Sequence, residues 1–156
     1  MTWLDDEANN SGRNEKSDLH EQELIRRSNY WALIIEALHA EIEAINSHHY
    51  WKSKVGAFPV KLVKPFGFEG WQVNRSGTMF VAIEIQNRAN HVLIGRQFSD
   101  PTLYSDFKKR EKLRVDTRDN RVILITEDGE FLMVPDAVVQ YLLKAVIQSL
   151  KRPTGN

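Results

Sequence analysis

Glu84 and Gln86 are a pair of residues whose types and spacing could carry out chemistry. They flank Ile85 near the end of a segment in which apolar and polar residues alternate, the pattern of a β-strand. Side chains two positions apart on a strand point to the same face, so both could contact one metal ion or one water molecule. Mg²⁺ prefers oxygen ligands and normally needs a second carboxylate, for which Glu69 is the nearest upstream acid.

This pair resembles the metal-binding element of the restriction-endonuclease-like nucleases, in which an acid and a polar residue two positions later end a core strand. The second residue is usually lysine, and glutamine occurs in some members. The resemblance implies a Mg²⁺-dependent nuclease, or a DNA-binding domain derived from one, with Glu69, Glu84 and Gln86 as the catalytic residues. Glu and Gln are also common on the solvated face of a strand, which is the alternative interpretation.

Histidine is another common metal ligand, and the chain has five, including the adjacent His48 and His49. Adjacent residues on a helix diverge by about 100°, which makes them poor joint ligands. Since the chain has no cysteine and no fixed His/Asp spacing, no zinc site is predicted. We expect His48 and His49 to end the first helix, where a charged imidazole interacts favourably with exposed carbonyl groups.

Two basic segments could bind an anion. Between Glu43 and Glu69 the chain has four lysines and no acid, with aromatic residues interleaved among them. Single-stranded nucleic acid is bound by such a mixture, because cations contact phosphates and rings stack on bases. The binding candidates in this segment are Trp51, Lys52 and Lys54. The alternative is a loop-to-strand segment that buries its rings and exposes its lysines to solvent.

The second basic segment, residues 108–114, supplies the candidates Lys108, Lys109 and Arg110. We expect it at the C-terminal end of a short helix, where each exposed cation stabilises the helix dipole by ~0.3–1 kcal/mol. That role needs no ligand. If both basic segments lay on the same side of the sheet, however, they would form an anion-binding surface.

Composition narrows the function classes further. The chain has 156 residues with 42% hydrophobic content, enough for one domain with its own core. The absence of cysteine excludes disulfides, thiolate catalysis and Cys-ligated metal sites. The 21 basic and 21 acidic residues cancel, so only local patches could attract nucleic acid. The sequence motifs of phosphate-binding loops, dinucleotide-binding sites, serine nucleophiles and HExxH zinc sites are missing. No cofactor is therefore predicted, and Mg²⁺ would be required only under the nuclease interpretation.

Periodicity predicts a single α+β domain. Its expected order is α-ββββ-α-βββ-α, in which an antiparallel-rich sheet is packed by a long N-terminal helix, a short middle helix and a C-terminal amphipathic helix. The first helix starts near Asp18 and carries a stripe of apolar residues through Ile45. The later elements are strands over residues 58–63, 69–74, 78–86 and 91–98, a helix over about 101–112, strands over 113–117, 121–127 and 130–134, and a helix over 136–152.

The ends of the chain are more polar than its middle. Residues 1–17 are expected to form a flexible arm, in which Trp3 and Leu4 are either a docking motif or a staple onto the domain over residues 18–152. Residues 153–156 form a tail. No apolar run approaches the ~20 residues that cross a bilayer, and the acidic N-terminus lacks the pattern of a signal peptide. We therefore expect a cytoplasmic location.

The leading functional interpretation is a non-enzymatic protein-interaction or regulatory module, similar to an adaptor or chaperone. It rests on the wide apolar surface of the first helix, on the Trp3-Leu4 pair and on expected exposed strands between Gly77 and Phe98. The order of elements is similar to that of small secretion chaperones, so a protein partner and a homodimer are expected. The nuclease is the first alternative, and a nonspecific nucleic-acid-binding domain that uses the basic patches is the second.

Overall fold

The computed structural model describes residues 29–77 and 79–152. The predicted arm with Trp3 and Leu4, the start of the first helix near Asp18 and the tail over residues 153–156 lie outside the described residues. In chain order the elements are the N-terminal helix, described over residues 29–47, α2 (Trp51–Val55), β1 (Lys61–Val63), β2 (Trp71–Arg75), β3 (Val81–Asn87), β4 (His91–Phe98), α3 (Pro101–Asp106), β5 (Arg110–Arg118), β6 (Arg121–Ile125), β7 (Phe131–Met133) and α4 (Asp136–Lys151).

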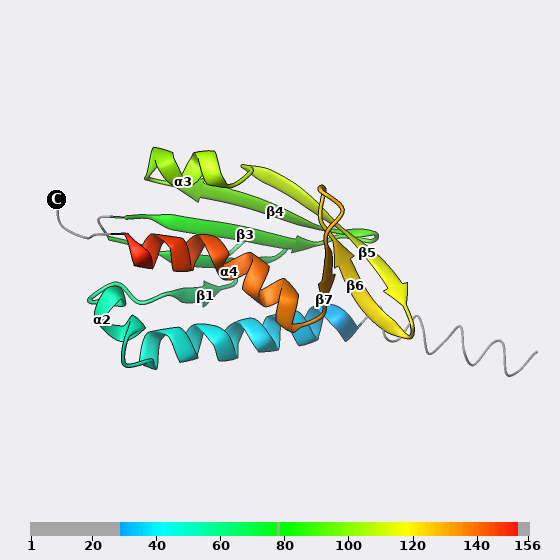
Figure 1. Cartoon of the computed structure of the whole chain (residues 1–156), viewed down its shortest axis with the longest axis horizontal. Coiled ribbons are helices and arrows are strands. Elements are labelled where there is room, and N and C mark those ends of the chain that lie inside the picture. The colour runs from blue at the N-terminus through cyan, green and yellow to red at the C-terminus, as the bar shows by residue number, and fades with distance from the viewer. Residues whose placement is uncertain (1–28, 78, 153–156) are drawn as a thin grey trace, which may run out of the picture.

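The seven strands form one antiparallel sheet, in which each strand pairs with its neighbours in the sequence (Figure 1). This arrangement confirms the predicted α+β class and the predicted order of the elements, with α2 as an additional short helix. β1 and β7 are the edge strands. Between Gly77 and Phe98, β3 and β4 are each paired on both sides, so neither strand offers a free edge to a partner.

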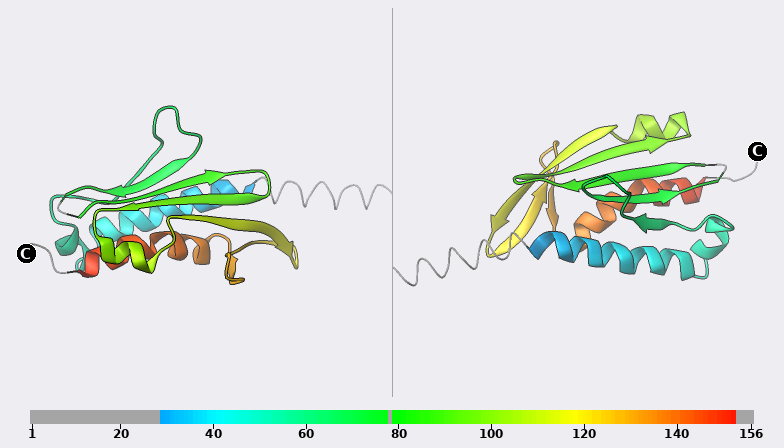
Figure 2. Two further views of the ribbon diagram at one scale, coloured as in Figure 1. Left: turned by 90° about the horizontal axis from the view of Figure 1, so that it is seen from above. Right: turned by 180° about the vertical axis from the view of Figure 1, so that it is seen from behind.

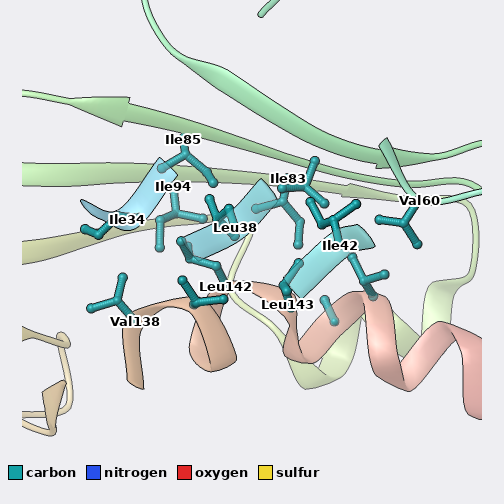
Figure 3. Close-up of a cluster of buried hydrophobic side chains, with 14 of the residues drawn as sticks. Ile34, Leu38, Ile42, Val60, Ile83, Ile85, Ile94, Val138, Leu142 and Leu143 are labelled. Carbon is teal, nitrogen blue, oxygen red and sulfur yellow. The ribbon is translucent and has the colours of Figure 1, made fainter. Parts of the chain in front are cut away.

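The N-terminal helix and α4 cover the same face of the sheet (Figures 1 and 2). Both helices repeat apolar residues every three or four positions, so each has one continuous stripe to bury. Figure 3 shows the two stripes meeting the strands through Ile34, Leu38 and Ile42 of the N-terminal helix, Val138, Leu142 and Leu143 of α4, and Ile83, Ile85 and Ile94 of the sheet. The N-terminal helix therefore packs on the sheet, as the predicted α+β architecture requires.

α3 is shorter than the sequence predicted. Its start is as expected, since the Asp100 side chain accepts a hydrogen bond from the Thr102 amide at 2.9 Å and Pro101 occupies the first helical position. The helix ends at Asp106 because Phe107 is already extended and packs against Phe98. β5 then begins at Arg110, so residues 108–114 do not lie at a helix C-terminus. The helix-dipole role predicted for that basic segment is wrong.

Arg75 joins α2 to the sheet, and nothing in the local sequence pattern pointed to it. It is a buried cation on β2 without a carboxylate partner among the described residues. Its guanidinium donates instead to the carbonyl oxygens of Lys54, Val55 and Phe58, at 3.2 to 3.5 Å. Burial lowers the pKa of Arg75. These bonds satisfy carbonyl groups at the end of α2 that have no partner within the helix.

Tyr30 joins the N-terminal helix to the other end of the sheet. Its ring is buried in the core, and its hydroxyl donates to the Asn87 side chain at the end of β3. Burial raises the pKa of Tyr30 to about 12 from its usual value of 10.0. The folded state therefore holds the phenol proton more tightly than the unfolded chain does.

Two leucines of the N-terminal helix test the packing. Leu38 is fully buried, whereas Leu33 keeps 48% of its surface exposed. We expect Leu38→Ala to lower the free energy of unfolding by about 2–5 kcal/mol, because it removes contacts and leaves a cavity. Leu33→Ala should change it by less than about 1 kcal/mol. Urea denaturation followed by circular dichroism measures both, and equal losses would contradict packing of this stripe on the sheet.

The pKa of Tyr30 gives a pH dependence with a defined sign. Because the folded pKa is raised, the stabilisation from the protonated phenol is complete below pH 10 and is lost as the pH rises from 10 towards 12. The difference in free energy of unfolding between the wild type and Tyr30→Phe should therefore shrink over that interval. Urea titrations at several pH values measure it, with Tyr104→Phe on α3 as the control. A difference that stays constant up to pH 12 would refute the expectation.

Candidate anion-binding face of the sheet

The sheet has one covered face and one open face. The buried residues Val55 of α2 and Leu103 of α3 belong to the same core as those of the N-terminal helix and α4, so the described helices all contribute to the covered side. No helix among residues 29–77 and 79–152 lies on the opposite face (Figure 2). That open face is where side chains of the strands meet solvent directly.

β5 places a row of cations on the open face. Side chains alternate along a strand, and Glu111 and Leu113 of β5 are buried on the covered side. The even-numbered positions therefore face outward, and four of these five carry a positive charge, the exception being Asp116. We call these four residues the β5 row: Arg110, Lys112, Arg114 and Arg118. Neighbours within Arg110–Lys112–Arg114 are about 7 Å apart, since a strand rises ~3.4 Å per residue.

Among the described residues, the side chains of the first three cations of the β5 row form no ion pair. All three side chains are exposed. An acid does lie close to Lys112, because Glu127, the partner of Lys108, accepts a hydrogen bond from the Lys112 amide at 3.1 Å. The fourth, Arg118, lies 3.3 Å from a carboxylate oxygen of Asp116. An exposed cation that forms no ion pair can bind an anion without first losing an existing partner.

The register of the sheet places polar side chains beside the β5 row. Arg110 lies opposite Gly95, which lies opposite Glu84. Gly95 has no side chain, so a shallow pocket of about 260 Å³ opens there between Glu84, Gln86 and Arg110. An adjacent rung of the sheet places Lys112 opposite Leu93, on the same face.

Glu84 and Gln86 share one face, as predicted for the metal-binding pair, but Glu69 does not join them directly. Glu84 is 3.5 Å from the Gln72 side-chain nitrogen. Gln86 accepts a hydrogen bond from Arg88 at 2.6 Å, and Arg88 forms an ion pair with Glu69 at 3.4 Å. Within the described ranges no group of three or more His, Asp or Glu side chains could hold a metal ion. The two polar residues therefore lie in a network of amides and a guanidinium.

The first predicted basic segment does not share this face. Trp51 is partly buried against the core, and α2, which carries Lys52 and Lys54, packs against α4 on the covered side. Lys54 lies 5.9 Å from the ring centroid of Tyr50. The sequence predicted an anion-binding surface only if both basic segments met on one side, and that condition is not fulfilled.

Of the three candidates named in the second predicted segment, only Arg110 belongs to the β5 row. Lys108 precedes the strand and forms ion pairs with Glu127 at 3.0 Å and Asp128 at 3.5 Å. The hydrogen bond with Glu127 raises the pKa of Lys108, and the same bond lowers the pKa of Glu127. Lys109 is exposed, and its carbonyl oxygen accepts a hydrogen bond from the Arg96 amide at 2.7 Å.

Lys112, Arg114 and Arg118 were not predicted as site residues. Their signal was present in the sequence as a cation at every second position, which is the period of a strand. This alternation was not interpreted as a strand because the preceding helix was expected to continue through Lys112. On a helix the same residues would point in different directions around the axis.

The adjacent histidines His48 and His49 lie just beyond the N-terminal helix. The helix is described to residue 47, and His48 and His49 follow it with their rings stacked at 4.4 Å. Their position after the helix is as predicted. Stacking is allowed because the chain leaves the helical path there, so the two side chains do not diverge as they would on a helix.

A buried ion pair fixes β5 on the covered side of the sheet. Glu111 and Arg96 of β4 are 3.0 Å apart, and both side chains are only 3% exposed. Tyr141 of α4 donates to the second Glu111 oxygen, and burial followed by this bond raises the pKa of Tyr141. The Arg96 guanidinium lies 5.7 Å from the ring centroids of both Phe107 and Tyr141. The negative charge of Glu111 is therefore neutralised away from the β5 row.

Two pockets on the covered side contain no buried polar side-chain atom that lacks a hydrogen-bond partner. One of about 230 Å³ lies beside Arg96, Glu111 and Tyr141, whose polar atoms bond one another. Another, of about 580 Å³, is bordered by apolar side chains such as Leu33 and Val122. Among the described residues no buried side-chain nitrogen or oxygen lacks a hydrogen-bond partner.

Comparisons with known proteins give this chain no relative. No protein-family model, no curated protein and no solved structure matches it. Within the described residues no helix is long and apolar enough to span a membrane. The geometry of the open face is therefore the basis on which a function can be proposed.

Glu111→Ala tests whether the buried pair holds β5 in place. Removing the carboxylate leaves the buried Arg96 charge without its partner, and we expect the free energy of unfolding to fall by about 3–5 kcal/mol. Glu127→Ala, which removes the exposed partner of Lys108, should cost much less because solvent screens that pair. Urea denaturation of both variants gives the comparison. Equal losses would mean that Glu111 is not the anchor of this strand.

Proposed function

We propose that this protein is a non-enzymatic binding module that holds a nucleic acid on the open face of its sheet. The observation that carries the proposal is the β5 row, in which four of the five outward positions of one strand are Arg or Lys. Phosphate groups are the abundant anions whose repeat along a polymer can engage several cations at once. A line of cations at regular spacing suits such a polymer better than a single small anion.

Side chains beside the β5 row could contact a nucleic acid through hydrogen bonds as well as through charge. Glutamine and asparagine side chains of β2, β3 and β4 share the open face, and such amides can bond to bases or sugars: Gln72, Asn74, Gln86 and Gln97. Arginine, which makes up three of the four cations, can bond a phosphate through two N–H groups at once.

A protein partner, the leading interpretation from the sequence, stays a prediction with less support. The apolar stripe of the N-terminal helix is buried against the sheet, and β3 and β4 are interior strands. Both features are therefore accounted for by the core of this domain. The Trp3-Leu4 pair lies outside the described residues. A homodimer and a cytoplasmic location also stay predictions, and the latter would place the protein together with RNA and DNA.

The nuclease alternative concerns the same face, since Glu84 lies two strands from the β5 row. If this alternative holds, the protein should cleave its ligand in the presence of Mg²⁺, and Glu84→Ala should abolish cleavage while leaving binding intact. The proposal of a non-enzymatic module expects binding with no cleavage. Incubating a labelled oligonucleotide with and without Mg²⁺ separates the two.

The β5 row can be tested by removing its three unpaired cations in Arg110→Ala/Lys112→Ala/Arg114→Ala. Each cation that contacts a phosphate contributes to counterion release, so the slope of log affinity against log salt should fall by about 2. We expect affinity for an oligonucleotide at low salt to weaken by at least about 10-fold. Fluorescence anisotropy of a labelled oligonucleotide over a salt series measures both quantities.

The matched control removes three exposed lysines from the helix side, as Lys52→Ala/Lys144→Ala/Lys151→Ala. It lowers the net charge of the protein by the same amount without touching the open face. The control should retain most of the affinity and the salt slope. If both triple variants weaken equally, or if the wild type binds no nucleic acid, the β5 row is not a specific binding surface.

A further inference from the structure

An apolar patch adjoins the β5 row on the open face. Ile125 and Phe131 lie on the same rung of the sheet as Arg114, and Ile123 and Met133 lie on the next. Phe131 is 52% exposed and Met133 is 40% exposed, while the two isoleucines beside them on β6 are buried. Neither isoleucine belongs to the main core, which lies on the other side of the strands. The edge of the open face thus presents an aromatic ring on an apolar support.

Arg118 covers part of that ring in a defined geometry. Its guanidinium carbon lies 4.4 Å from the centroid of Phe131, within the range of a cation–π contact. The Arg118 Nε donates to a carboxylate oxygen of Asp116 at 3.3 Å, which restrains the same guanidinium. Both Arg118 and Phe131 are about half exposed. The guanidinium and the ring are therefore already in contact before any ligand arrives, which lowers the ordering cost of binding.

Resting on the proposed function, we infer that the ligand is single-stranded nucleic acid, and that Phe131 and Arg118 form its base-stacking platform. Proteins bind unpaired bases by stacking them on aromatic rings or guanidinium planes. A duplex keeps the faces of its bases inside the helix, so it could use the β5 row but not this platform. β7 lies two strands from β5, about 10 Å, so the platform and the row belong to one continuous surface.

The inference predicts a dependence on bases and not only on charge. Three probes separate these: a labelled oligo-dT of about 12 nucleotides, a duplex of the same length, and inorganic polyphosphate. The wild type should bind the single strand more tightly than either other probe. Phe131→Leu keeps an apolar side chain but removes the ring, and should weaken binding to the single strand on the order of 10-fold. Binding to polyphosphate should not change.

Two further variants make the test independent of folding. Phe131→Trp keeps an aromatic surface and should retain the affinity for the single strand. Arg118→Lys keeps the charge and loses the plane, so it should weaken binding to the single strand and leave polyphosphate unaffected. Thermal unfolding followed by circular dichroism shows whether each variant is folded, and because both residues are half exposed we expect the midpoints to stay close to that of the wild type.

The outcomes distinguish this inference from the function on which it rests. If Phe131→Leu binds the single strand as tightly as the wild type, or if the duplex binds equally well, the platform is refuted while the β5 row can still hold. If polyglutamate binds as tightly as oligo-dT, the surface recognises acidic protein, which refutes both. If the wild type binds no probe, the proposed function itself is wrong.

Discussion

The register of β5 is the constraint on which the open face depends. Because side chains alternate along a strand, a shift of one residue would turn the cations of the β5 row into the core and Leu113 out to solvent. Leu113 is fully buried, and Glu111 is bonded to both Arg96 and Tyr141. These contacts come from β4 and α4, so the position of the row is fixed by two separate elements. The open face is thus a consequence of packing on the covered face.

The buried ion pair is better understood as a device for register than as a source of stability. Removing two charges from water costs several kcal/mol, which their attraction only offsets when every polar atom is bonded. In this pair Arg96 Nη1 donates both to Glu111 and to the Lys108 carbonyl oxygen at 3.1 Å, and the other Glu111 oxygen accepts a hydrogen bond from Tyr141. A one-residue slip would turn Glu111 away from the covered face and leave the buried Arg96 charge without its partner. Such a penalty selects one alignment of β4 and β5 over its neighbours.

The sequence allowed the class and the order of elements to be predicted, because helices and strands have different apolar periods. A local signal, the Asp100 cap followed by Pro101, also marked the start of α3. The site could not be predicted in the same way. Whether residues 108–112 continue a helix or begin a strand is decided by Arg96 and Tyr141, which are distant in sequence. Which strands lie at the edges of the sheet also depends on how all seven strands pair, and the alternation of apolar and polar residues within one strand does not determine that pairing.

A chain without net charge can still carry a cationic face, because the fold sorts charges that the composition only counts. β5 assigns its unpaired cations to one side, while acids such as Glu127 and Asp128 are engaged by Lys108 in the turn before β7. A neutral protein exerts little long-range attraction on a polyanion, so association depends on contacts within about a Debye length, ~8–10 Å at ordinary ionic strength. Selectivity on this surface would then come from short-range features beside the row, namely the amides on one side and the aromatic platform on the other.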